Sequence, residues 1–201
     1  MEDFFKDFFE TTVNALRHVP LKEVEKALVI LHATYERGGR IYVFGNGGSL
    51  ALATHFVADL NKTVFSQHLG EGQKRFQAIR LPSTESELTA WANDIGYDMV
   101  FVGPLQNYLE DRDAIIAISS SGNSPNVIKA VEFAKARSVP VIGMSGFDGG
   151  KLNVLADAKI LVSTGQGEYE VVEGVHAVIL HMIIKYFKNA FTYLAENGTA
   201  K

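Results

Sequence analysis

The sequence predicts an α/β fold, a three-layer α-β-α sandwich in which a five-stranded parallel β-sheet carries helices on both faces. Two observations predict it. Five short apolar runs are rich in β-branched residues, and stretches with helical spacing of apolar residues alternate with them. Such apolar runs are typical of strands buried on both faces, and their alternation with helices favours parallel pairing through right-handed crossovers. With 201 residues, 47% of them hydrophobic, we expect one domain over residues 1–201.

Two extra helices are expected before the first strand. Apolar residues recur at helical spacing over Asp3–Leu16 and Leu21–Tyr35, and the glycines of ERGGR end the second helix. The first helix carries an aromatic group that exceeds what one face of a short terminal helix usually buries: Phe4, Phe5, Phe8 and Phe9. Either these rings pack within the chain, or residues 1–37 contribute to contacts between copies of it.

The strands and the remaining helices follow in alternation. The expected strands are Ile41–Phe44, Phe76–Leu81, Ala114–Ser119, Val139–Ser145 and Lys159–Ser163. The expected helices are Leu50–Asn61, Ser86–Leu109 with a break near Gly96, Asn126–Arg137 and Glu170–Leu194. In parallel sheets ligands bind at the carboxyl ends of the strands, so the functional residues are expected in the turns that follow them.

Composition excludes several classes of protein. The net charge is -4 with both signs interspersed, so no basic patch indicates nucleic-acid binding. No apolar run reaches the roughly 18 residues of a membrane span, and the N-terminus MEDFFKDFFETT does not resemble an export signal. With 0 cysteines the chain has neither disulfide nor thiolate zinc site, which fits a reducing compartment. We expect a cytoplasmic protein without membrane or nucleic-acid partners.

Two of the strand-to-helix turns have similar chemistry. GNGGS, residues 45–49, follows the first strand, and the serine-rich run at 119–124 follows the third. Glycines let the backbone approach a ligand, helix N-termini offer unpaired N–H groups, and serine hydroxyls add donors, so together they predict a phosphate site. The alternative, that Ser124 caps a helix beginning at Pro125, accounts for one serine only. G-x-G-x-x-G and G-K-[ST] are absent, so a phosphorylated small molecule is expected rather than a nucleotide.

Two pairs of side chains could carry chemistry. His55 and Asp59 are four residues apart on one predicted helix, and Glu173 and His181 are eight apart on another. If the helices meet, these residues could bind a divalent metal ion or form an acid/base set. Taken separately, an i, i+4 pair is often a surface hydrogen bond, and a histidine in an apolar helix is often a core residue, which is the interpretation for His176.

Four motifs in this order resemble one known family. GNGGS, WANDIGYD, ISSSGNSPNVIKA and GFDGGKL are similar to the SIS (sugar isomerase) domain, and specifically to phosphoheptose isomerases acting on sedoheptulose 7-phosphate. The resemblance covers nearly the whole chain. It implies a five-stranded parallel sheet flanked by helices, and homotetramers whose active sites form between subunits.

The resemblance also implies roles for individual residues. The serine-rich turn, Ser119, Ser120, Ser121 and Ser124, would hold the sugar phosphate. The same pocket would be lined by Asn46, Gly47, Gly48, Ser49, Asn93, Asp94 and Glu173. From the sequence alone, Asp94 at the helix break could equally cap the next helix.

A zinc site is implied as well. The family binds zinc through a His and a Glu four apart, a Gln, and a His eight residues further on. The matching positions are His55, Asp59, Glu173 and His181. Asp59 thus replaces Glu and Glu173 replaces Gln, and residues 170–173 differ from an Asp-Arg-x-Gln pattern common in the family.

The implied reaction is an aldose–ketose isomerisation through an enediol, with Asp59 and His181 as the acid/base residues. Three alternatives stay open: a non-catalytic tetramer that binds a replication initiator, a phosphosugar sensor, and an isomerase for another sugar phosphate. Because an acid at 59 and histidines at 55 and 181 are present, the enzyme is favoured.

Overall fold

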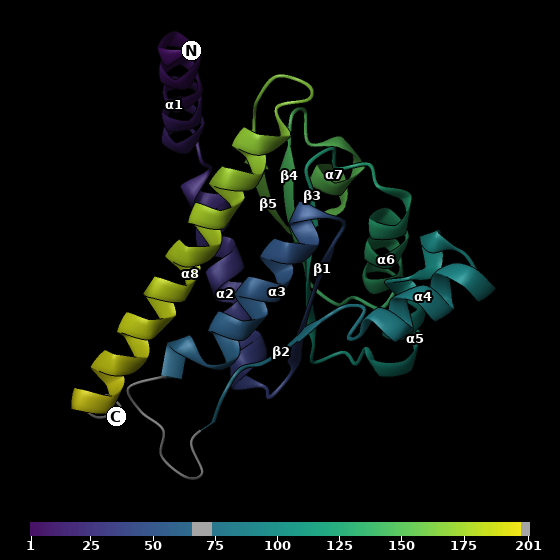
Figure 1. Ribbon diagram of the computed structural model, residues 1–201. Helices are drawn as coiled ribbons and strands as arrows, with labels where there is room; N and C mark the ends of the chain where they lie inside the picture. The colour runs from purple at the N-terminus through teal and green to yellow at the C-terminus, as the bar shows by residue number, and fades with distance from the viewer. Residues whose placement is uncertain (66–73, 198–201) are drawn as a thin grey trace.

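The computed structural model describes residues 1–65 and 74–197. One parallel sheet lies at its centre, with strand order β2-β1-β3-β4-β5 (Figure 1). The strands are β1 (Arg40–Gly45), β2 (Gln77–Arg80), β3 (Ala114–Ser119), β4 (Val141–Gly146) and β5 (Ala158–Val162). The predicted fold class is confirmed.

The long helices lie where the helical spacing of apolar residues predicted them. They are α1 (Glu2–Arg17), α2 (Leu21–Glu36), α3 (Gly48–Asn61), α6 (Pro125–Lys135) and α8 (Tyr169–Asn197). The predicted helix with a break near Gly96 is divided into α4 (Glu85–Asp94), the 3-10 turn η2 (Tyr97–Met99) and α5 (Val102–Tyr108). Gly96 at the break has a φ of 137°, which a helix cannot accommodate. Two elements were not predicted, η1 (Thr63–Phe65) and α7 (Gly150–Leu155), because both are too short for a helical period.

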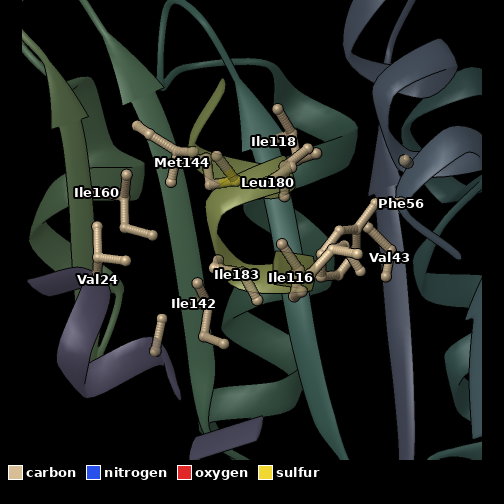
Figure 2. Close-up of a cluster of buried hydrophobic side chains, with 14 of the residues drawn as sticks. Val24, Val43, Phe56, Ile116, Ile118, Ile142, Met144, Ile160, Leu180 and Ile183 are labelled. Atoms are coloured by element: carbon tan, nitrogen blue, oxygen red, sulfur yellow. The ribbon is translucent and has the colours of Figure 1, made fainter. Parts of the chain in front are cut away.

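Two apolar layers hold the helices on the sheet. Along β3, Ile116 and Ile118 belong to the core under α2, α3 and α8, while Ile115 and Ala117 belong to the core under α4–α7. Figure 2 shows the first layer, where Leu180 and Ile183 of α8 meet strand side chains. Burial on both faces explains why these strands are continuous apolar runs. In the described ranges, none of the helices combines the length and apolar character that a membrane span requires.

Helix α1 extends beyond the sheet (Figure 1), and Ala15 is its buried residue. The four phenylalanines that precede it are exposed by 40–68%. The interpretation that they pack within the chain is therefore wrong for this structure.

The ends of β1 and β3 form the switch point of the sheet. These strands are neighbours, yet β1 continues into α3 on one face and β3 into α6 on the other. Their connections diverge, which opens a crevice at the carboxyl edge where α/β proteins bind ligands. Both predicted phosphate-binding turns lie at this crevice.

His176 makes stability depend on pH. It is fully buried on α8, its Nε2 lies 3.1 Å from the carbonyl oxygen of Ser145, and burial lowers the pKa of His176 from 6.5 to about 4. Between pH 6.5 and 4 the unfolded chain binds a proton that the folded protein excludes, so stability falls as the pH falls through this window, by about 3 kcal/mol. Urea unfolding should show this loss. His176→Gln keeps a donor for Ser145 without titrating, and an equally steep loss in that variant would contradict the assignment.

Candidate functional site

Two hydroxyl groups of the serine-rich turn face each other. Ser119 Oγ and Ser124 Oγ lie 3.0 Å apart. Ser124 is the N-cap residue of α6, with Pro125 at the first helical position, but its side chain makes no capping hydrogen bond. Capping therefore does not explain this serine, whose hydroxyl pairs with that of Ser119 at the wall of the crevice.

The turn is held from behind by Gly146–Leu152, which runs from the end of β4 into α7. Gly146 N–H donates to the carbonyl oxygen of Ser120 (2.8 Å), and Leu152 N–H donates to that of Gly122 (2.9 Å). Gly122 has a φ of +64°, and a Cβ there would lie 2.0 Å from the carbonyl oxygen of Gly149. Only glycine allows this close packing, which explains why the two glycine-containing motifs occur together.

Serines line most of a cleft of about 150 Å³ at the switch point. Its lining is Asn46, Ser49, Ile118, Ser119, Ser120, Ser121, Ser124, Tyr169 and Glu173. None of these is a lysine or arginine. Ser120 Oγ is buried and has no hydrogen-bond partner in the described part of the chain. A buried, unpaired donor beside two helix N-termini favours an anionic ligand, because an anion would supply the missing acceptor.

Asn46 is fixed by a residue that sequence reasoning missed. Its Nδ2 donates to Asn126 Oδ1 (3.0 Å), Asn126 Nδ2 donates back to Asn46 Oδ1 (2.8 Å), and the Tyr97 hydroxyl donates to the same oxygen (3.0 Å). Asn126 is buried on α6, so the pair joins the two turns. The signal for Asn126 was an amide among the apolar residues of a predicted helix. Tyr169, also missed, gave no signal beyond its place at a helix start.

Glu173, on α8, lines the same cleft, and its carboxylate lies beside the first residues of α3. Gly47 is the N-cap of α3, with a φ of +53°, and a Cβ on Gly48 would lie 2.1 Å from Glu173 Oε2. The carboxylate thus lies directly against the helix backbone. Burial, and to a smaller extent the charge of Glu170, raises the pKa of Glu173.

A second group lies further along the same two helices. Asp59 Oδ2 is 3.3 Å from His55 Nε2 and 3.9 Å from His181 Nε2. The two imidazole rings have centroids 4.9 Å apart. Both histidines are about half exposed, while Asp59 is largely buried. The helices α3 and α8 therefore do meet, as the acid/base and metal hypotheses required.

Glu173 is not part of this group. It precedes His181 by eight residues, or about 12 Å along the helix axis, and its carboxylate lies at Gly48 instead. The four residues implied as zinc ligands are therefore separated: three come together and the fourth lines the serine cleft.

Asn93 and Asp94 lie outside the cleft. Both are exposed at the end of α4, where Asn93 Nδ2 donates to Asp94 Oδ1 (2.8 Å). Asp94 does not cap the following turn, whose N-cap is Gly96. Asn93 and Asp94 are thus absent from the lining of the cleft, and their part in binding substrate stays a prediction.

The group fits a divalent metal ion. One ligand atom each from His55, Asp59 and His181 lies within 4.8 Å of the others. Two imidazoles and one carboxylate are a ligand set that zinc uses, and three protein ligands leave a position open for a reacting molecule. The same residues can also transfer protons, since a carboxylate and an imidazole are the usual general acids and bases.

Fold and cleft place the chain in the class of α/β sugar isomerase domains, and the sequence comparison agrees: the SIS domain profile matches residues 5–146. The chain belongs to the SIS domain family and, within it, to the phosphoheptose isomerases. It is 37% identical to a phosphoheptose isomerase of Fusobacterium nucleatum over 82% of this chain and 80% of that protein. It is 35% identical to a probable phosphoheptose isomerase of Thermoplasma volcanium over 88% and 87% of the two chains.

A solved structure agrees with these relatives. The phosphoheptose isomerase of Neisseria gonorrhoeae superposes with a TM-score of 0.81 at 27% identity, covering 94% of this chain and 98% of that one.

Proposed function

We propose that the protein is an intramolecular aldose–ketose isomerase that interconverts sedoheptulose 7-phosphate and D-glycero-D-manno-heptose 7-phosphate through an enediol. The relatives named above support the reaction class. The observation that carries the proposal is the meeting of Asp59 with two histidines on the same pair of helices that borders the serine cleft.

The spacing of the two groups suits this substrate. Ser49 lines the cleft and His55 belongs to the His/Asp group, and the two residues are six positions, or about 9 Å, apart along α3. In a ketoheptose 7-phosphate, five C–C bonds and the C–O–P linkage separate the carbonyl carbon from the phosphorus atom. At about 1.25 Å of extension per bond, this chain spans roughly 9 Å when extended. The phosphate can then occupy the cleft while C1 and C2 reach the His/Asp group.

Phosphate binding falls to the serine turn. Ser119, Ser120, Ser121 and Ser124 offer hydroxyl donors, and Ser49 and the N-termini of α3 and α6 add further polar groups. These neutral donors hold a phosphate without a lysine. Asn46, fixed by Asn126, and Glu173 would contact the sugar hydroxyls next to it.

Proton transfer between C1 and C2 falls to Asp59 and His181. In the ketose-to-aldose direction a proton leaves C1 and a proton is delivered to C2, while O2 gains a proton and O1 loses one; Asp59 and His181 share these transfers. Their separation of 3.9 Å leaves both within reach of adjacent substrate atoms. Zinc, the proposed metal, would be held by His55, Asp59 and His181, and when bound it would polarise the substrate oxygens.

We also propose that the enzyme is a cytoplasmic homotetramer formed by one domain, in which residues 1–37 contribute to the subunit contacts. The exposed phenylalanines of α1 support this assembly, because an aromatic group of this size is seldom left in water. Sedimentation equilibrium measures the oligomeric state directly, and a monomer at micromolar concentration would contradict it.

A substitution at Ser120 is expected to weaken substrate binding without lowering stability. Its buried hydroxyl has no partner within the described ranges, so Ser120→Ala should leave the thermal unfolding midpoint unchanged or raise it slightly. The same change removes a donor to the phosphate, worth about 1.5–3 kcal/mol for a charged acceptor, and should raise KM by about 10- to 100-fold. Initial rates and thermal unfolding check both effects. An unchanged KM would remove Ser120 from the phosphate site.

The proposed substrate is tested by comparing ketose phosphates of five, six and seven carbons, each assayed for its aldose product. We expect the highest kcat/KM for the seven-carbon substrate. A preference for a shorter sugar would retain the isomerase and contradict the heptose.

A further inference from the structure

We propose that Thr63 is a positioning residue that orients the carboxylate of Asp59, so that a single oxygen, Oδ2, faces the metal position. This inference rests on the metal centre of the proposed function. It assigns a role to a residue outside every motif of the sequence.

The two oxygens of Asp59 have different surroundings. Oδ2 lies 3.3 Å from His55 Nε2 and 3.9 Å from His181 Nε2. Oδ1 accepts a hydrogen bond of 2.8 Å from Thr63 Oγ1. The carboxylate torsion of aspartate has a broad energy profile, so without a fixed donor it would rotate and present either oxygen, or both. The threonine hydroxyl holds one oxygen and thereby assigns the other to the histidines.

The position of Thr63 is set by the core. It begins η1, whose other two residues, Val64 and Phe65, are buried. The Phe65 ring packs against those of Phe76 and Phe191, with centroids 6.0 and 5.2 Å away. The hydroxyl is thus delivered to Asp59 by a turn anchored independently of the histidines. Hydrogen bonds that orient a metal ligand in this way typically change metal affinity by about 10- to 100-fold.

The test measures zinc affinity rather than catalysis. Protein stripped of metal by a chelator is titrated with Zn²⁺ in competition with a chromogenic chelator, for the wild type, Thr63→Val and Thr63→Ser. Valine keeps the shape of threonine and removes the hydroxyl, whereas serine keeps the hydroxyl. Thr54→Val is the matched control, because Thr54 lies on α3 with His55 and Asp59, but its hydroxyl donates to the carbonyl oxygen of Leu50 (2.9 Å).

We expect Thr63→Val to bind Zn²⁺ at least about 10-fold more weakly, and Thr63→Ser and Thr54→Val to bind it like the wild type. Absorption spectra of the Co²⁺ forms should change for Thr63→Val alone, because a freely rotating carboxylate alters the number of oxygens bound. Thermal unfolding of the metal-free variants shows whether each is folded. If Thr63→Val is unfolded, Thr63→Ala replaces it in the titration.

The two possible failures are distinguishable. Equal zinc affinity in the wild type and Thr63→Val would overturn the role of Thr63 and leave the metal centre in place. Absence of zinc binding by the wild type would overturn the metal centre and this inference together, whereas the isomerase would still be judged by its own assay.

Discussion

Replacing Asp59 with asparagine is expected to lower kcat by about 10²- to 10⁴-fold, the usual contribution of a general acid or base. Asparagine has nearly the same shape, so the hydrogen bond from Thr63 and the packing between α3 and α8 can persist. Its amide, however, cannot accept a proton at neutral pH and is a poorer metal ligand than a carboxylate. The loss should therefore appear in kcat with little change in thermal stability.

The measurement is the steady-state rate of aldose formation, with Asp111→Asn as the control. Asp111 is an exposed carboxylate before β3, remote from the cleft lining and from the His/Asp group. It should keep wild-type kinetics. Wild-type kcat in the Asp59 variant would remove this residue from the chemistry.

Replacing Gly122 with alanine should have the largest effect on stability among substitutions in the serine turn. The added Cβ would lie 2.0 Å from the carbonyl oxygen of Gly149, and the φ of +64° is itself unfavourable for alanine. Backbone strain and overpacking each cost about 1–3 kcal/mol, so we expect a loss of at least about 2 kcal/mol in the free energy of unfolding. Displacement of the turn should also raise KM.

Urea unfolding of this variant is best compared with Gly174→Ala. A Cβ at Gly174, in the interior of α8, meets no atom within 4 Å in the described structure. Alanine there should be neutral or stabilise by about 0.5–1 kcal/mol. If both variants unfolded at the same urea concentration, the packing of Gly122 against Gly149 would not matter to the fold.

The fold could be predicted because its strands are buried on both faces. Residues such as Ile115 and Ile116 occupy opposite apolar layers, so β3 is apolar from Ala114 to Ile118 and the run is visible in the sequence alone. The short elements could not be predicted in the same way. Thr63–Phe65 and Gly150–Leu155 are ordered by tertiary contacts rather than by a period of their own.

The site could be predicted only in part, for a related reason. The serine turn was visible from composition, because so many small hydroxyl residues at a strand end have few structural uses. The pairing of Asp59 with His181 depends on two helices meeting, which no local pattern reports. The position of Glu173, by contrast, could be predicted. Its spacing of eight residues from His181 indicates a separation of about two helical turns, and it lines the serine cleft instead.

The most direct measurement is ¹H NMR of sedoheptulose 7-phosphate incubated in D₂O with the wild-type protein, followed over time. Isomerisation through an enediol predicts the anomeric signals of the aldoheptose phosphate, with solvent deuterium entering the carbons beside the carbonyl wherever the abstracted proton exchanges. Both changes should be lost in Asp59→Asn and His181→Ala. An unchanged ketose spectrum with wild-type protein, with and without added Zn²⁺, would contradict the assignment of this chain as a phosphoheptose isomerase.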